Sequence, residues 1–162
     1  MALFVKETLI AAPPEEVFAF HESPRALETL IPPWESMKVV ESARSLAVGS
    51  RVVLQGQMLF VPLKWVAVHT AYNPPHEFED IQESGPFAKW VHKHKFIPTG
   101  NKETLLRDEV EYQVPLGKLG ELFGGWFVRS KLERMFAYRH EVTKRLVEAG
   151  EWRSDSSASD SQ

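Results

Sequence analysis

The hydrophobic positions in the last third of the chain repeat with a helical period. Glycines bound this stretch on both sides, at 124–125 and at 150, and residues 119–123 suggest one or two separate helical turns before the first pair. The spacing therefore predicts one long amphipathic helix over residues 126–149. Its stripe follows steps of three and four residues, with an arginine on the same line: Val128, Leu132, Met135, Arg139, Val142 and Leu146.

The middle of the chain alternates with period two, which is typical of strands with one buried face. Turn residues separate the alternating segments at intervals of about 8–12 residues. No helical pattern lies between them, so we expect antiparallel neighbours along a meander. The segments after the opening strand 3–10 are 36–43, 50–57, 61–72, 77–83, 88–97 and 104–114.

Two short helices are expected between the opening strand and the meander. Pro13-Pro14 ends the strand, and Glu15 and Glu16 suit the positive end of a helix dipole. A second helix over 25–31 begins after Ser23-Pro24, where serine caps and proline fills the first turn. The fold class predicted is α+β: a curved seven-stranded antiparallel sheet with two short helices, wrapped around the long C-terminal helix.

Length and composition fit one domain over residues 1–150, followed by a Ser- and Asp-rich tail, 151–162, that we expect to be disordered. The net charge of −3 disfavours a protein that neutralises nucleic-acid phosphates. The absence of cysteine excludes disulfides and thiolate chemistry. We see neither a signal peptide nor a segment able to span a bilayer, and expect a cytoplasmic protein.

Alternation also predicts which side chains face the interior. In 88–97 the lysines at 93 and 95 should face water. The other strands follow by the same rule, although a bulge would invert any of them. The interior face is predicted to hold Trp65, Ala67 and His69; Phe78, Asp80 and Gln82; Trp90, His92, His94 and Phe96; and Leu106, Asp108, Val110, Tyr112 and Val114.

This interior contains an unusual number of polar groups. Because a guanidinium on an apolar stripe requires an anionic partner, we predict a network from Arg139 through Asp80 or Asp108 to a histidine. The network is either purely structural or also fixes the polar end of a ligand. We expect a pocket beside it, lined by Trp65, Phe78, Trp90, Phe96, Val110, Tyr112, Met135 and Phe136.

Three stretches carry a resemblance to a known family. They are APPEEVF (12–18), GPF (85–87) leading into WVHKHKF (90–96), and TLLRDEVEY (104–112) followed by PLG (115–117). With the order of elements, they make residues 1–149 resemble the START-like, or SRPBCC, helix-grip superfamily, in its polyketide cyclase/dehydrase-like ligand-binding branch. The resemblance implies a cavity between sheet and helix that takes hydrophobic ligands. The fold hosts passive binders and enzymes alike.

Two functions remain open. The first is binding of a hydrophobic or aromatic small molecule, lipid- or polyketide-like, by the pocket residues together with His92, His94 and Arg139. The second is a cyclase- or dehydratase-like enzyme using His92 or His94 with Asp80 or Asp108 as general acid and base. His92-x-His94 also occurs in metal sites, and Asp80 or His69 could complete three ligands, but this spacing is a weak signal. We therefore expect no metal and no cofactor. The ligand and the oligomeric state are not apparent.

Overall fold

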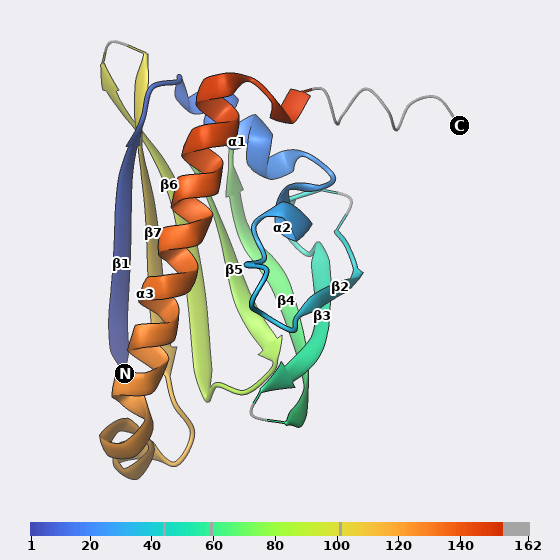
Figure 1. Ribbon diagram of the computed structural model, residues 1–162, viewed down its shortest axis with the longest axis vertical. Coiled ribbons are helices and arrows are strands. Elements are labelled where there is room, and N and C mark those ends of the chain that lie inside the picture. Colours follow the sequence, from blue (N-terminus) through green and yellow to red (C-terminus); the bar gives the residue numbers. More distant parts are fainter. Residues whose placement is uncertain (44, 59, 101, 154–162) are drawn as a thin grey trace.

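The computed structural model describes residues 1–43, 45–58, 60–100 and 102–153. One antiparallel sheet holds seven strands in the order β1-β7-β6-β5-β4-β3-β2, and the long helix α3 runs along it (Figure 1). The α+β helix-grip architecture expected from the sequence is therefore confirmed. In chain order the elements are β1 (Ala2–Ile10), α1 (Pro14–Glu22), α2 (Ala26–Thr29), β2 (Lys38–Glu41), β3 (Arg51–Met58), β4 (Val61–Asn73), β5 (Glu77–Ser84), β6 (Lys89–Gly100), β7 (Glu103–Gln113) and α3 (Gly117–Ala149).

The differences from the expected elements lie mainly at their ends. The helix predicted over 25–31 contains only the single turn α2, and the strand predicted over 36–43 is the four-residue β2. Both elements lie beside proline pairs or loops, so only a few residues there carry the periodic pattern from which a helix or strand is predicted. The pairing itself agrees with a meander, because every strand from β2 to β7 pairs with its sequence neighbour and β1 closes onto β7.

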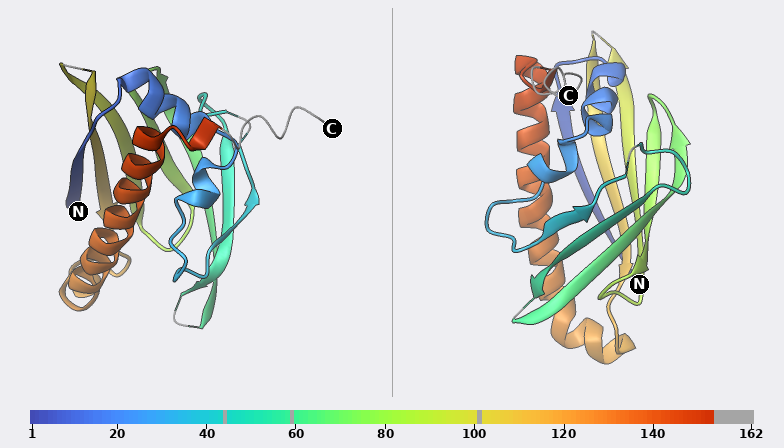
Figure 2. Two further views of the ribbon diagram at one scale, coloured as in Figure 1. Left: turned by 45° about the horizontal axis from the view of Figure 1, so that its top comes forward. Right: turned by 90° about the vertical axis from the view of Figure 1, so that its right-hand side faces the viewer.

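Helix α3 is longer than predicted. It spans 33 residues without interruption, so the break expected at Gly124–Gly125 is wrong. A Cβ on either glycine would meet nothing within 4 Å, and no packing demand there forces the chain out of helix. Figure 2 shows that the helix axis instead changes direction near its N-terminal end. Gly150, with φ of 69°, ends the helix in the left-handed conformation that favours glycine.

The long helix packs chiefly against β1, and it also contacts α1 and β7. Leu132, Phe136 and Val142 are buried in that contact, as the helical stripe predicts, whereas Met135 is only partly buried. In Figure 1, α3 lies over the side of the sheet that carries β1, and β2, β3 and β4 lie to its right. The helix therefore covers one half of the concave face.

Two apolar clusters make up the core. The α1 cluster contains Phe18, Phe78, Phe96, Leu106 and Val142 among its buried members. The Trp90 cluster is built separately, from other positions on the same strands and helix. Its buried members are Phe4, Trp90, Val110, Tyr112, Val114, Leu132 and Phe136, with Trp65, Phe87 and Met135 packed against them.

The folded part of the chain extends slightly past residue 150, the predicted end of the domain. Trp152, assigned to the tail by composition, packs against Phe20 with ring centroids 6.3 Å apart, and Arg153 pairs with Glu16 at 2.8 Å. The rest of the predicted tail, 154–162, lies outside the described residues. Within the described part of the chain, no helix has both the length and the hydropathy that crossing a membrane requires.

Candidate functional site

A layer of polar side chains separates the two apolar clusters. Along β6, Trp90 belongs to one cluster and Phe96 to the other, and the two inward positions between them are histidines. The same change occurs on β7 and on α3, and on β5 Asp80 follows Phe78 of the α1 cluster. Strand pairing brings these positions together, because Asp80 lies opposite His92 and His94 lies opposite Asp108. We call Asp80, His92, His94, Asp108 and His140 the His/Asp layer.

Asp108 is the centre of this layer. Its Oδ1 lies 3.1 Å from His92 Nε2, and its Oδ2 lies 2.7 Å from His140 Nε2. His94 Nδ1 approaches Oδ1 to 2.8 Å, but at an angle that makes no hydrogen bond. His140 uses its other ring nitrogen, Nδ1, to pair with Thr8 Oγ1 on β1 at 2.9 Å. The carboxylate is thus contacted from β6 and from the long helix.

Asp80 faces the other side of the same two histidines. Its Oδ2 lies 3.6 Å from His92 Nδ1 and 3.5 Å from His94 Nε2. The side chains of Asp80 and His94 keep 15% and 13% of their surface accessible, whereas those of His92 and Asp108 keep 4% and 5%. Asp80 and His94 are therefore the members that a molecule between sheet and helix would meet.

Burial and the charges within the layer shift the pKa values of its two neighbouring histidines, His92 and His94, in opposite directions. Burial acts to lower the pKa of His94, but the Asp108 and Asp80 carboxylates outweigh it and raise that pKa to about 9. Burial and the charge of His94 lower the pKa of His92. The pKa of Asp108 stays well below its ordinary value, because the charge of His94 and the hydrogen bond from His140 overcome the opposing effect of burial. At neutral pH, two carboxylates thus share one protonated histidine, His94, with His92 neutral.

Two further histidines border the layer, so five of the chain's six histidines gather here. His21 on α1 lies 6.0 Å from His94 between ring centroids, and its Nδ1 donates to Val17 O at 2.8 Å. Burial and the charge of His94 lower the pKa of His21 to about 4. His69 on β4 is buried, and its Nδ1 lies 3.2 Å from Ser50 O.

The direct pairing predicted for Arg139 with Asp80 or Asp108 is wrong, and its predicted contact with a ligand stays a prediction. Its Nε donates to Leu30 O at 3.2 Å, and its guanidinium lies 5.4 Å from the centre of the Phe136 ring. No ion pair joins it to Asp80 or Asp108 within the described residues. The next residue, His140, reaches Asp108 instead. A sequence signal for His140 existed, because it continues the four-residue series Val128, Leu132, Phe136 on the buried helix face.

Most of the other predicted inward positions are buried. On β4, where bulges shift the register, Val66 is buried although alternation places it on the other face, and Trp65 and Ala67 are only partly buried. Trp90, His92, Phe96, Val110 and Tyr112 are all buried on the face that α3 covers. The interior pocket stays a prediction, because these side chains pack against one another and, among the described residues, none of the predicted lining set borders either of the two cavities described below. The full set of predicted ligand-binding residues comprises the five buried residues of β6 and β7 named above together with Trp65, Phe78, His94, Met135, Phe136 and Arg139.

Both cavities lie at the margins of the sheet–helix interior. The larger, of about 420 Å³, lies where α1, α2 and the end of α3 meet, and Phe20, Leu146 and Trp152 are among its lining residues. The smaller, of about 260 Å³, lies between the Trp34 segment, β3 and α3. We call it the Trp34 cavity. Its lining residues are Trp34, Glu35, Ser36, Gln57, Phe127, Lys131 and Arg134.

Comparison with known families agrees with this architecture. The family described as polyketide cyclase / dehydrase and lipid transport matches residues 10–137. The chain belongs to this family, whose members share the START-like helix-grip fold. The search of curated proteins found no match.

Solved structures of similar fold come from several organisms. A norcoclaurine synthase of Thalictrum flavum, a point mutant in complex with a transition-state analogue, superposes with a TM-score of 0.72 at 14% identity, over 93% of this chain and 96% of that one. The Zhui aromatase/cyclase of Streptomyces sp. R1128 gives 0.69 at 14%, over 91% and 93%. A START superfamily protein of Mycobacterium smegmatis gives 0.67 at 15%, over 91% and 97%. At these identities the likeness concerns the fold alone.

Proposed function

We propose that this protein binds a hydrophobic or aromatic small molecule, lipid- or polyketide-like, between the sheet and α3, with the molecule's polar end against Asp80 and His94. The observation that carries the proposal is the His/Asp layer. Buried charges cost stability unless they are fully paired. A core of this size packs well without such a layer, so its retention favours a role in recognising a polar group.

The partial exposure of Asp80 and His94 supports the same reading. Both belong to the concave side of the sheet, where α3 covers only one half. Aromatic rings flank them, with Phe78 stacked on His94 at 4.0 Å between centroids. Apolar walls around a small number of convergent polar groups are typical of small-molecule sites.

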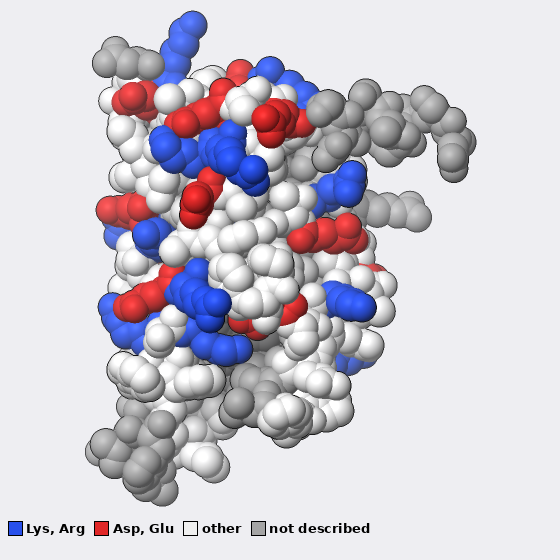
Figure 3. Space-filling view, in the orientation of Figure 1, with Lys and Arg blue, Asp and Glu red and all other residues white. Residues whose placement is uncertain are grey.

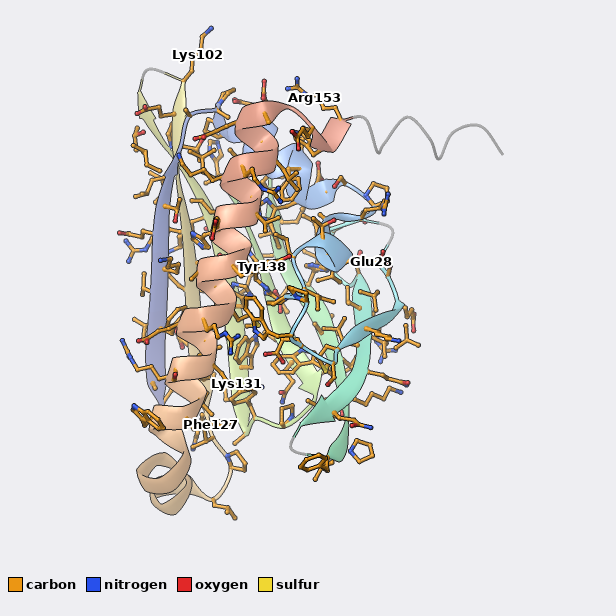
Figure 4. All side chains as sticks on the ribbon, in the orientation of Figure 1. Glu28, Lys102, Phe127, Lys131, Tyr138 and Arg153 are labelled. Atoms are coloured by element: carbon orange, nitrogen blue, oxygen red, sulfur yellow. The ribbon has the colours of Figure 1, made fainter. Side chains whose placement is uncertain are left out.

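The Trp34 cavity lies against α3 at the margin of the sheet–helix interior. Trp34 contacts Tyr138 of α3 at 5.3 Å between rings, and the Arg134 guanidinium lies 4.4 Å from the Trp34 ring centre. Phe127, Lys131 and Tyr138 follow one another along α3 in Figure 4. Figure 3 shows that both signs of charge mix over the face that carries α3. Within the cavity Lys131 pairs with Glu35 at 3.5 Å, so the stacked Trp34 and Arg134 offer a flat surface that suits an aromatic ring.

A dye-displacement experiment tests the proposal. The protein should bind the fluorescent probe 1-anilinonaphthalene-8-sulfonate, and flat aromatic acids or fatty acids should displace it. Asp80→Asn and His94→Gln should change the affinity for the acids by tenfold or more while affecting an uncharged aromatic hydrocarbon little. His76→Gln, at an exposed histidine outside the layer, is the control. Equal affinities in all four proteins would contradict the proposal.

A cyclase- or dehydratase-like enzyme is the second candidate. Its supporting observation is the pairing of each layer histidine with a carboxylate, a geometry suited to general acid–base chemistry on a bound carbonyl compound. The discriminating experiment incubates the protein with polyketide-like β-polyketone substrates. Product formation that His94→Gln abolishes, but His76→Gln does not, favours the enzyme, and ligand binding without turnover favours the passive binder.

A further inference from the structure

We propose that Asp80, His92 and His94 form a binding site for one divalent transition-metal ion, of the Zn²⁺ or Fe²⁺ class. The site goes beyond the proposed ligand-binding function and does not depend on it. The three residues come from two paired strands, β5 and β6, and each directs a potential ligand atom toward the same point.

The distances suit a metal centre. The three candidate ligand atoms all lie within 4.8 Å of one another, and the carboxylate oxygen of Asp80 lies 3.6 Å from His92 Nδ1 and 3.5 Å from His94 Nε2. Ligand atoms bound at about 2.0–2.2 Å to a tetrahedral or octahedral ion lie roughly 3.0–3.5 Å from one another. The two distances from Asp80 therefore already match a bound ion, and the two ring nitrogens, at most 4.8 Å apart, would move toward each other on binding.

The hydrogen bonding of His92 leaves one of its ring nitrogens available as a metal ligand. His92 Nε2 faces the carboxylate of Asp108 at 3.1 Å, so a neutral imidazole donates its proton there. The lone pair on Nδ1 then faces the carboxylate oxygen of Asp80. A metal ion bound to both atoms would take the positive position that the His94 ring, 3.5 Å from Asp80 Oδ2, fills in the metal-free protein.

Asp108 supplies the outer support that such sites require. Metal-binding histidines usually pair their second ring nitrogen with a carboxylate or carbonyl, which fixes the ring and strengthens the donor. Here one carboxylate faces the second nitrogen of both histidines, at 3.1 Å from His92 Nε2 and 2.8 Å from His94 Nδ1. His140 holds that carboxylate from α3. His94 Nδ1 lacks an aligned hydrogen bond in the described structure, although it lies within reach of the same carboxylate.

The donor set decides the class of metal. Two imidazoles and one carboxylate favour Zn²⁺, Fe²⁺ and their neighbours over Mg²⁺ or Ca²⁺, which prefer oxygen ligands. Three protein ligands also leave at least one coordination position open. Asp80 and His94 retain accessible surface, so this position is within reach of water or of an oxygen atom of a bound small molecule.

Metal titration of the chelator-stripped, ligand-free protein tests the proposal. Zn²⁺ content after dialysis and the visible absorption of added Co²⁺ should both give one ion per chain. Asp80→Asn and His94→Gln should weaken binding at least tenfold, and Asp108→Asn should weaken it about 10- to 100-fold without changing the stoichiometry. His76→Gln should bind as the wild type does. Circular dichroism establishes that each variant is folded.

X-ray absorption spectroscopy of the wild-type Zn²⁺ complex covers the case in which a layer variant fails to fold. Scattering from two imidazoles with additional oxygen ligands supports the site. A wild type that binds no stoichiometric ion, a spectrum without imidazole scattering, or loss of binding in His76→Gln would each overturn it. Dye binding by the metal-free protein is unaffected by these outcomes, so failure of the metal site and failure of the proposed function are distinguishable.

Discussion

Replacing His140 by leucine tests the packing of the His/Asp layer. The substitution removes the 2.7 Å contact with Asp108 Oδ2 and the 2.9 Å contact with Thr8 Oγ1. A hydrogen bond to a charged group contributes about 1.5–3 kcal/mol, and a neutral one about 0.5–1.5 kcal/mol. We therefore expect His140→Leu to lower the free energy of unfolding by roughly 2–4 kcal/mol, although leucine remains compatible with the helix and with its apolar neighbours.

A double-mutant cycle separates this interaction from general disruption. Asp108→Asn and His140→Leu should couple by about 1–3 kcal/mol, because the two side chains are in direct contact. Asp108→Asn and Arg139→Leu should couple more weakly than this, through charge alone, because Arg139 bonds to the Leu30 carbonyl and makes no direct contact with Asp108. Arg139 is the matched control, one residue away on the same helix.

The assay is equilibrium unfolding in urea, followed by tryptophan fluorescence at pH 7 in the presence of a chelator. An unchanged dependence on urea concentration across the variants allows their free energies to be compared. Stronger coupling of Asp108 to Arg139 than to His140 would refute the assignment and restore the network expected from the helical stripe.

The remaining predictions concern backbone packing, the core and pH. A Cβ on Gly56 would lie 2.8 Å from Ser36 O and 2.9 Å from Met37 Cα, so Gly56→Ala should destabilise the protein by about 1–3 kcal/mol in urea unfolding, whereas Gly125→Ala, in open space on α3, should stabilise it by about 0.5–1 kcal/mol. Phe136 is fully buried, and Phe136→Ala should cost about 3–5 kcal/mol in the same assay. An effect of Phe136→Ala below about 1 kcal/mol would contradict its central place. Because His21 stays neutral in the folded chain down to about pH 4 but titrates near 6.5 when unfolded, the unfolded state binds more protons in between, and stability should fall as pH drops from 6.5 to 4. His21→Gln should lose less stability over that window, and an unchanged pH profile would contradict this role.

Much of the fold was accessible from the sequence, because most of its strands have one buried face. The alternation Trp90, His92, His94, Phe96 on β6 predicts both the strand and the inward histidines, and the burial of these positions follows it. The long helix followed from its stripe, but its start did not. Glycine lowers helix propensity without excluding helix, so Gly124–Gly125 indicated a break that the chain does not make.

The composition of the site was harder to predict than its strands. Which helical residue meets Asp108 depends on the rotation of α3 by one residue, about 100°, relative to the sheet. A charge argument favoured Arg139, and the rotation in the structure favours His140. The approach of His21 could not be predicted either, because it depends on how α1 packs over β6 and not on any local pattern.

Imidazole NMR tests the central claim, that the His/Asp layer meets a bound small molecule, most directly. The protein is labelled with ¹⁵N-histidine, kept free of metal by a chelator and titrated with 2-naphthoate, with signals assigned from single His→Gln variants. If the ligand meets the His/Asp layer, the ring signals of His94 and His92 should shift saturably, and the signal from exposed His76 should stay unchanged. Saturable binding that leaves the His92 and His94 signals unmoved would contradict it.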